Sequence, residues 1–227
     1  MFYNKLKNKV FGEEMDRKYY FFDFDGTLVD SMPYLEKLTL GFLNKYNLKY
    51  PDNIMDIIIP LGYRGGAEYY VSTYKELHRT VEQVKKELEE GLFVDYRDTI
   101  PLKSGALEYL LKIKREGKKL FILSASQHLQ LDVCINRLRI GDLFDRVISC
   151  EEYGTTKGDT QLYKKVAKDL GITPKDIVFV DDNINSIKTA KKAGCYCVGV
   201  YDKVGDKVWE EMQEVADETI KDFGNKL

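Results

Sequence analysis

Short apolar segments that alternate with helical patterns constrain the fold of this chain more than any other feature of its sequence. These segments are residues 19–22, 120–123, 146–149, 177–180 and 195–200. Their apolar residues are adjacent to one another and do not alternate with polar ones, which is typical of parallel strands covered on both faces. Between them, leucine, isoleucine and valine recur at helical spacing, and glycines follow several of the runs. The alternation predicts an α/β fold built on a doubly wound parallel sheet.

One interval interrupts this alternation. Between Ser31 and Pro101 the sequence has helical patterns and no convincing strand. Pro33 is placed to open a first helix, a second helix is predicted around residues 70–77, and a third from Val81 to about Gly91. An inserted helical unit of this kind would sit over the carboxyl ends of the strands, where open α/β sheets bind ligands.

We therefore expect three parts in the chain. Residues 1–17 are polar and lysine-rich and form an N-terminal extension. Residues 18–31 and 101–227 form the α/β core, and residues 32–100 form an all-helical cap. Two local signals add detail to the core: Ser104 is expected to cap its first helix, and a C-terminal helix is predicted from Asp206 to Phe223, with its apolar face on the sheet.

Acidic residues follow two of the predicted strands. The first strand runs into Asp23-Phe24-Asp25-Gly26, where two carboxylates can face one crevice and the glycine lets the chain turn. Asp-Gly alone is a common turn signal, but burying a second carboxylate beside it is costly unless a cation offsets the charge. The fourth strand likewise ends in Asp181-Asp182. Four carboxylates would thus converge on one edge of the sheet, and such an all-oxygen set selects Mg²⁺ or a similar hard ion.

Two further polar residues are predicted at the same edge. Ser124 ends the second strand in Ser124-Ala125-Ser126, and a hydroxyl there can donate to a phosphoryl oxygen, although serines are ordinary in loops. Lys157 lies between the third strand and the next helix. A lysine is usually a solvated surface charge, so the interest of Lys157 comes only from its position at the rim that carries the acids.

These residues together resemble the haloacid-dehalogenase-like superfamily, whose members are mostly phosphatases. The resemblance extends roughly from Tyr19 to Val200. It rests on four motifs in order: DFDGTLVDS from Asp23, FILSAS with Ser124, TTKGDTQLYKKVAKDLGI with Lys157, and VFVDDNINSIKTAKKAG. The insert resembles the helical cap of the phosphoglycolate-phosphatase and β-phosphoglucomutase-like branch.

The resemblance implies a chemical role for each acidic residue. Asp23 would be the nucleophile that forms an aspartyl-phosphate. Mg²⁺ would be held by Asp23, the backbone carbonyl of Asp25 and the side chain of Asp182, and Asp181 would help to hold the ion or its waters. Asp25 would protonate the leaving alcohol and then activate the water that breaks the aspartyl-phosphate.

The resemblance also implies which residues bind the phosphate. Lys157 would neutralise charge on Asp23 and on the phosphoryl oxygens, and Ser124 would donate a hydrogen bond to them. The expected substrate-binding residues are Ser124, Ala125, Lys157 and Gly26. In the cap, the segment Tyr63–Gly66 is expected to be a flexible turn, whose Arg64 could clamp a substrate anion or simply face solvent.

The first cap helix departs from the family's mutases. Members that act as sugar-phosphate mutases carry a histidine early in the cap, four positions after a Thr or Ser. Here Ser31 occupies the hydroxyl position and Leu35 the histidine position. The resemblance therefore favours a Mg²⁺-dependent phosphatase acting on a small phosphorylated metabolite. A sugar-phosphate mutase and a non-catalytic regulator that binds a phosphorylated metabolite remain alternatives, and the sequence leaves the ester unspecified.

Composition excludes other classes of protein. The formal net charge of -2 argues against nucleic-acid binding, which needs a basic surplus. The apolar runs are short compared with a membrane span, and the N-terminus lacks the apolar stretch of a secretory signal. Four cysteines in a chain of 227 residues do not form a disulfide framework, and with two scattered histidines they favour no zinc site. We expect a monomer in a reducing cytoplasm.

Overall fold

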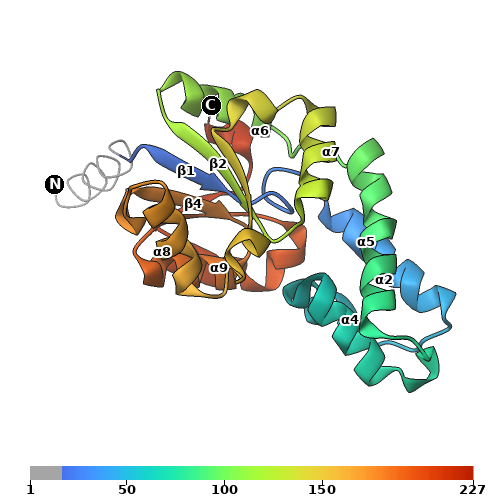
Figure 1. Ribbon diagram of the computed structural model, residues 1–227. Helices are drawn as coiled ribbons and strands as arrows, with labels where there is room; N and C mark the ends of the chain where they lie inside the picture. Colours follow the sequence, from blue (N-terminus) through green and yellow to red (C-terminus); the bar gives the residue numbers. More distant parts are fainter. Residues whose placement is uncertain (1–16, 227) are drawn as a thin grey trace.

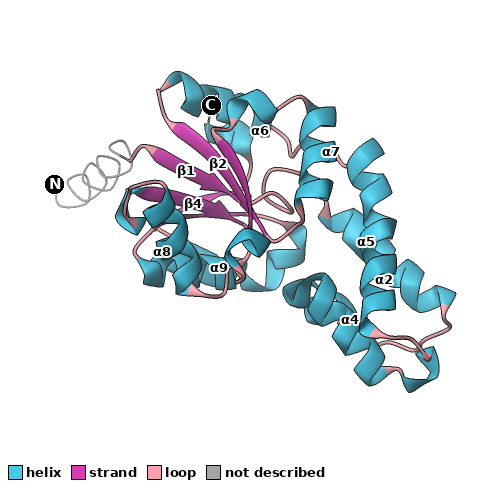
Figure 2. Cartoon of the chain, in the orientation of Figure 1, coloured by secondary structure: helices cyan, strands magenta, loops and turns pink. Residues whose placement is uncertain are grey.

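The computed structural model describes residues 17–226, so the predicted N-terminal extension lies, apart from Arg17, outside the described residues. The described part has a layered core, with helices on both faces of a sheet, and a helical cap beside it (Figure 1, Figure 2). The strands are β1 Tyr19–Phe22, β2 Lys119–Ser124, β3 Arg146–Ser149, β4 Ile177–Asp181, β5 Tyr196–Val200 and β6 Glu218–Ile220. The helices are α2 Met32–Lys45, α3 Ile54–Ile58, α4 Gly62–Thr73, α5 Val81–Asp98, α6 Ala106–Arg115, α7 His128–Leu138, α8 Thr160–Asp169, α9 Ile184–Ala193 and α10 Trp209–Val215.

The sheet is parallel throughout the described residues, with strand order β3-β2-β1-β4-β5-β6. The chain crosses from one side of β1 to the other between β3 and β4, which is the doubly wound topology that the sequence predicts. The predicted fold class is therefore confirmed. Phe22 pairs with Ile122 of β2 and with Val180 of β4, so the carboxyl ends of these three strands meet at one edge.

Two apolar layers cover the sheet. Alternate residues of β1 point to opposite faces. Phe22 packs in the layer formed with α6 and α7, whereas Phe21 packs in the layer formed with α8, α9 and α10. Burial on both faces explains why the strand sequences are nearly continuous in hydrophobicity. Cys195 and Cys197 share the second of these layers, and all four cysteines are buried and unpaired. Within the described residues, no helix combines the length and apolar character needed to cross a membrane.

The predicted C-terminal helix is wrong in its extent. Helix α10 covers only Trp209–Val215, and β6 follows it as a parallel neighbour of β5. The backbone N–H of Asp217 donates to the carbonyl of Cys197, and the Asp217 carboxylate accepts from the N–H of Cys197 (2.9 Å each), so the chain is drawn onto the sheet edge. The apolar face was predicted correctly, because Met212 is buried against the sheet and Trp209 packs on the same layer.

The cap has an apolar cluster of its own, to which α2, α4 and α5 contribute. The flexible turn predicted for residues 63–66 is wrong, because these residues form the start of α4. Ala67 and Tyr70 are buried in the cap cluster from this helix. Tertiary packing of that face thus outweighs the weak helix propensity of Gly65 and Gly66.

Helix α5 is longer than the sequence predicts. It begins at a capping box between Thr80 and Gln83 and continues to Asp98, past Gly91. A Cβ atom on Gly91 would lie 2.5 Å from Cδ1 of Leu38, so the glycine allows α2 to approach α5 closely. The residue that was expected to end the helix is therefore a packing contact inside it.

The second half of α5 belongs to the core. Leu88 lies in the cap cluster, whereas Leu92 and Tyr96 lie in the core layer of α6 and α7. From α7, the Arg137 guanidinium donates to the carbonyl of Tyr96 (3.1 Å) and to that of Ile100, which places a cation at the carboxyl end of α5. The two cap linkers also pair, since the N–H of residue 30 donates to the carbonyl of residue 101 (2.9 Å). The cap is thus joined to the core by packing as well as by its linkers.

The first core helix begins without the predicted cap. Helix α6 starts at Ala106, and the residue before it is Gly105, in the left-handed region with φ +71°. Ser104 lies one residue too early to serve as the N-cap, so that prediction is wrong by one position.

Candidate active site

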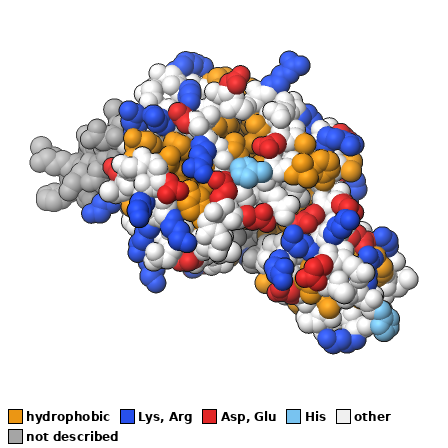
Figure 3. Space-filling view, in the orientation of Figure 1, with side chains coloured by type: hydrophobic (Ala, Val, Ile, Leu, Met, Phe, Trp, Pro, Cys, Tyr) orange, Lys and Arg blue, Asp and Glu red, His pale blue; other side chains and the backbone are white. Residues whose placement is uncertain are grey.

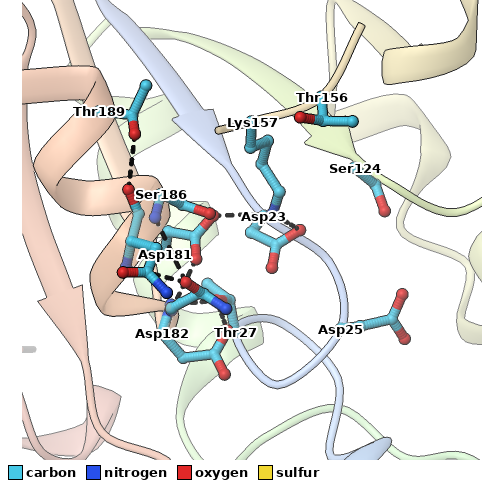
Figure 4. A network of polar contacts seen from close by, with 12 residues as sticks. Asp23, Asp25, Thr27, Ser124, Thr156, Lys157, Asp181, Asp182, Ser186 and Thr189 are labelled. Carbon is cyan, nitrogen blue, oxygen red and sulfur yellow. Dashed lines mark hydrogen bonds and ion pairs between the residues drawn. The ribbon is translucent and has the colours of Figure 1, made fainter. Parts of the chain in front are cut away.

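Three carboxylates meet at the carboxyl ends of β1 and β4 (Figure 4). One carboxylate oxygen from each of Asp23, Asp181 and Asp182 lies within 4.8 Å of the others. The N–H of Asp23 donates to the carbonyl of Val180 (2.8 Å), so the pairing of β1 with β4 extends into the acidic segment. Strand pairing therefore fixes the distance between acids that are far apart in the sequence.

Lys157 reaches into this acidic cluster from the loop before α8. Its Nζ lies 2.6 Å from Oδ1 of Asp23 and 2.7 Å from Oδ2 of Asp181, and its side chain is 11% exposed. The Tyr163 hydroxyl donates to the Lys157 carbonyl (2.9 Å), which holds the backbone in place. Burial alone would lower the pKa of Lys157, but the charges of Asp181 and Asp23 outweigh it and raise the pKa above its usual value. The lysine is a buried cation at the rim that the sequence indicated.

The cluster carries more negative than positive charge. Burial raises the pKa of Asp23; Lys157 opposes this shift, and Asp181 and Asp182 add to it. Burial and the charge of Asp181 raise the pKa of Asp182 to about 7. Three carboxylates against one ammonium leave two uncompensated negative charges when all are ionised, as many as a divalent cation carries. An all-oxygen cluster of this charge fits a hard divalent cation.

Asp181 and Asp182 differ in their partners. Both oxygens of Asp181 are engaged, one by Lys157 and the other by the N–H of Asn183 (2.7 Å), and its side chain is completely buried. Asp182 Oδ1 accepts a hydrogen bond from the Thr27 hydroxyl (2.9 Å), whose oxygen accepts in turn from the N–H of Asp182 (3.0 Å). Thr27 thus orients Asp182, while Asp181 orients Lys157.

Gly26 gives the Asp182 carboxylate its space. Its φ is +77°, and a Cβ atom there would lie 2.5 Å from Oδ2 of Asp182. A side chain at position 26 would therefore displace the carboxylate as well as strain the backbone.

Gly26→Ala is expected to destabilise the protein by about 1–3 kcal/mol and to lower its activity about 100-fold, because misplacing a site group by an ångström is costly. Gly117 provides a matched control, since its φ is also +77° but a Cβ atom there would meet no other atom within 4 Å. Gly117→Ala should show the stability loss alone. Thermal unfolding and turnover of both variants make the comparison, and equal activity losses would contradict the expected clash.

Asp25 stands apart from the acidic cluster. Its carboxylate points away from the other three in Figure 4 and accepts hydrogen bonds from the Tyr96 hydroxyl (2.5 Å) and the Ser126 hydroxyl (2.7 Å). The isolated bridge between Asp25 and Val29 holds the backbone of the turn. The side chain of Asp25 is therefore placed for a task different from that of Asp23, Asp181 and Asp182.

The end of β2 forms a third part of the site. Ser124 is 1% exposed, and its Oγ accepts a hydrogen bond from the N–H of Ser126 (3.0 Å), whereas Ala125 is exposed. The carbonyl of Ser126 accepts in turn from the Ser149 hydroxyl (2.9 Å), which fixes the loop. Because β2 is the neighbour of β1, Ser124 lies beside the segment that carries Asp23.

The cap residues that the sequence analysis singled out are engaged in packing, in burial or in ion pairs. Leu35 packs against the core layer of α6 and α7. Ser31 is completely buried at the start of the cap. Arg64 is exposed and forms ion pairs with Glu68 (3.2 Å) and Glu82 (3.9 Å). Those acidic partners lie within the cap, so the structure gives no support to Arg64 as a substrate clamp.

Sequence reasoning did not single out the residues that orient these acids. Thr27 and Ser126 both lie within the motif segments. Thr27 comes two residues after Asp25, and Ser126 comes two residues after Ser124, so their hydroxyls could have been identified from the sequence. Tyr96 lies 71 residues from Asp25, on the helix that was expected to end before it. Nothing local in the sequence marks that contact, because it depends on how α5 packs on the core.

The fold and the site agree with a comparison against known families. Residues 20–200 match the family described as haloacid dehalogenase-like hydrolase. The match spans most of the chain, and the protein belongs to this family. The resemblance drawn from the four motifs is confirmed, and the relatives lie in the phosphoglycolate-phosphatase and β-phosphoglucomutase-like branch.

Individual relatives are distant. The chain is 25% identical over 181 residues to hexitol phosphatase B of Escherichia coli (strain K12), covering 76% of this chain and 78% of that protein. It is 27% identical over 186 residues to phosphoglycolate phosphatase 1 of Pseudomonas aeruginosa, covering 79% and 67%. A crystal structure of β-phosphoglucomutase from Clostridium difficile superposes with a TM-score of 0.76 at 16% identity, covering 92% of each chain.

Proposed function

We propose that this protein is a Mg²⁺-dependent phosphatase that hydrolyses a small-molecule phosphate monoester through an aspartyl-phosphate on Asp23. The observation that carries the proposal is the contact of the buried Asp23 carboxylate with Lys157 (2.6 Å) inside a cluster of acids. Phosphatases among the relatives add support, since hexitol and phosphoglycolate phosphatases align over about three quarters of the chain.

In the first half of the reaction, an oxygen of Asp23 attacks phosphorus and the ester P–O bond breaks. The leaving oxygen takes a proton from Asp25, whose carboxylate stands apart from the acidic cluster. Lys157 neutralises the attacking carboxylate and the phosphoryl oxygens, and Ser124 donates a hydrogen bond to them. In-line attack between two anions is slow without such compensation.

In the second half, water attacks the phosphorus of the aspartyl-phosphate. Asp25, now ionised, takes a proton from that water, and the P–O bond to Asp23 breaks to release phosphate. Asp23 is again a free carboxylate and Asp25 is again protonated, as at the start of the reaction. A positioned acid–base group of this kind contributes about 10²–10⁴-fold to the rate. Ala125 and Gly26 would complete the phosphate-binding backbone at the strand ends.

The metal ion fits the charge and oxygen donors of the site. The side chains of Asp23 and Asp182 and the backbone carbonyl of Asp25 would hold Mg²⁺, and Asp181 would support the ion or its waters while it orients Lys157. When bound, the ion screens the repulsion between the Asp23 carboxylate and the phosphate. Thr27 and Gly26 would keep Asp182 in the position that the ion requires.

The mutase alternative lacks an observation in its favour. A mutase must protect its aspartyl-phosphate from water, and the position of the mutase histidine is occupied by Leu35, which packs against the core. The structural likeness to a β-phosphoglucomutase is a likeness of fold. The regulator alternative is opposed by the complete set of acids and Lys157.

A panel of phosphate esters separates these functions. The protein is incubated with Mg²⁺ and each ester, and both free phosphate and isomerised sugar phosphate are measured. Phosphate release from at least one ester is expected. Isomerisation without release would instead identify a mutase, and saturable binding without either product would identify a regulator.

The proposal extends to the substrate class and the cellular setting of this activity. Acidic and basic side chains are intermixed on the face shown in Figure 3, without the single-sign patch that nucleic-acid binding requires. This observation and the phosphatases among the relatives support a small phosphorylated metabolite as the substrate. We propose that the protein works as a monomer in the cytoplasm; its four buried, unpaired thiols are compatible with a reducing compartment.

A further inference from the structure

A hydrogen-bonded network joins the cap to Asp25. The Tyr96 hydroxyl of α5 donates to Oδ1 of Asp25 (2.5 Å), and the Ser126 hydroxyl donates to Oδ2 (2.7 Å). The hydroxyl oxygens of Tyr96 and Ser126 lie 3.4 Å apart. The two donors therefore hold the carboxylate from both ends and define one orientation for it.

The donors leave Asp25 able to react. A carboxylate has about four lone-pair directions, so two hydrogen bonds leave room for a leaving oxygen or a water. Burial raises the pKa of the Tyr96 phenol well above its usual value, so the phenol keeps its proton and remains a donor. Its side chain is 1% exposed, which keeps competing water away from the bond.

Tyr96 itself is fixed by several contacts. Its ring lies in the core layer with Leu92, and its backbone carbonyl accepts from Arg137 (3.1 Å). A second contact between cap and core lies nearby, where the amide of Gln130 in α7 donates to the hydroxyl of Tyr63 in α4 (3.3 Å). The cap helix thus presents the Tyr96 hydroxyl at a defined place above the strand ends.

We infer that Tyr96 is a positioning residue, which with Ser126 orients the Asp25 carboxylate for proton transfer to the leaving oxygen and from water. The inference rests on the proposed function. It assigns the core-packed second half of α5 a part in the chemical step, because one of the two donors to Asp25 comes from this end of the inserted segment. Loss of either hydroxyl frees the carboxylate to rotate away from the reacting oxygens.

The principal test is Tyr96→Phe, which keeps the buried ring and removes only the hydroxyl. For an alkyl phosphate ester, kcat is expected to fall about 10- to 100-fold with little change in KM, because the acid–base residue loses one of the two hydrogen bonds that orient it. For 4-nitrophenyl phosphate, the first release of nitrophenolate in a single turnover should change far less, since that leaving group departs without a proton.

A second measurement separates positioning from general damage. In an Asp25→Ala background, Tyr96→Phe should cause no further loss in the remaining turnover of the alkyl ester, because Tyr96 acts through Asp25. Ser126→Ala should repeat the dependence on leaving group. Tyr70→Phe is the matched control, since it removes a buried cap hydroxyl outside this network and should leave both esters unaffected.

The outcomes distinguish the two proposals. If wild-type protein releases phosphate and Tyr96→Phe keeps wild-type kcat on alkyl esters, the positioning role is overturned and the phosphatase stands. Equal losses on both esters, or an undiminished loss in the Asp25→Ala background, would also overturn it, because they indicate structural damage. If wild-type protein turns over no ester, the proposed function falls and this inference with it.

Discussion

Asp23→Asn is expected to abolish phosphate release from every ester that the wild-type protein hydrolyses, a loss on the order of 10⁴-fold or more. The amide has nearly the shape of the carboxylate but cannot form the aspartyl-phosphate. Phosphate release is measured with Mg²⁺ present. In the wild-type protein, a peptide phosphorylated on Asp23 is sought by mass spectrometry after rapid acid quench. Asp132→Asn, at an exposed position of α7, is the control and should retain full activity.

The same substitution should not weaken the fold. Burial and the neighbouring acids disfavour the ionised form of Asp23, as its raised pKa shows. With EDTA present, a neutral side chain relieves this repulsion, so the melting temperature of Asp23→Asn should equal or exceed that of wild type. A variant that is both inactive and markedly less stable would show that Asp23 supports the fold, and its inactivity would then not identify a nucleophile.

Removal of the divalent cation is expected to have an equally large effect. EDTA should lower turnover to background, and added Mg²⁺ should restore it. Asp182→Asn should raise the Mg²⁺ concentration for half-maximal activity by about 10-fold or more, because it removes one of the charged donors. Full activity in EDTA would contradict the metal-dependent reaction. An unchanged Mg²⁺ requirement in Asp182→Asn would remove that residue from the ligand set.

The pH dependence of stability checks the same site without turnover. The folded-state pKa of Asp182 is about 7, above the ordinary aspartate value of 3.8, so the folded protein binds this proton more tightly than the unfolded chain. The ionised Asp182 carboxylate therefore lowers the free energy of unfolding most above about pH 7. This destabilisation is relieved as the pH falls toward about 4. In EDTA, the stability advantage of Asp182→Asn over wild type should shrink between about pH 8 and about pH 5. Saturating Mg²⁺ should remove this dependence from the wild type, and an advantage independent of pH would contradict the assignment.

The sequence predicted the sheet and its acidic edge because both depend on local signals. Nearly continuous apolar strands imply a parallel sheet, and the carboxyl ends of neighbouring parallel strands must meet. That geometry is enough to bring Asp23 close to Asp181 and Asp182. The position of Lys157 after the third strand placed it at the same rim, and the motif resemblance then gave it a chemical role.

Other features depend on contacts between distant segments. The backbone pairing of Asp217 with Cys197 creates β6 where helical periodicity predicted a helix. Gly91 looked like the end of a helix, but it is the point where α2 meets α5. The hydrogen bond from Tyr96 to Asp25 depends on this longer helix. Because the sequence prediction ended the helix too early, it missed both the contact of α2 with α5 and this hydrogen bond.

Helix α5 also limits how this enzyme could be recombined with its relatives. Its first half packs with the cap through Leu88, and its second half packs with the core through Leu92 and Tyr96. A chimaera that exchanged residues 32–100 as a module would replace three buried core side chains, Leu92, Tyr96 and Ile100. Burial of each of the two aliphatic ones contributes about 1.5–3 kcal/mol. A graft that altered substrate preference while preserving the reaction would have to be joined within α5, between its two halves.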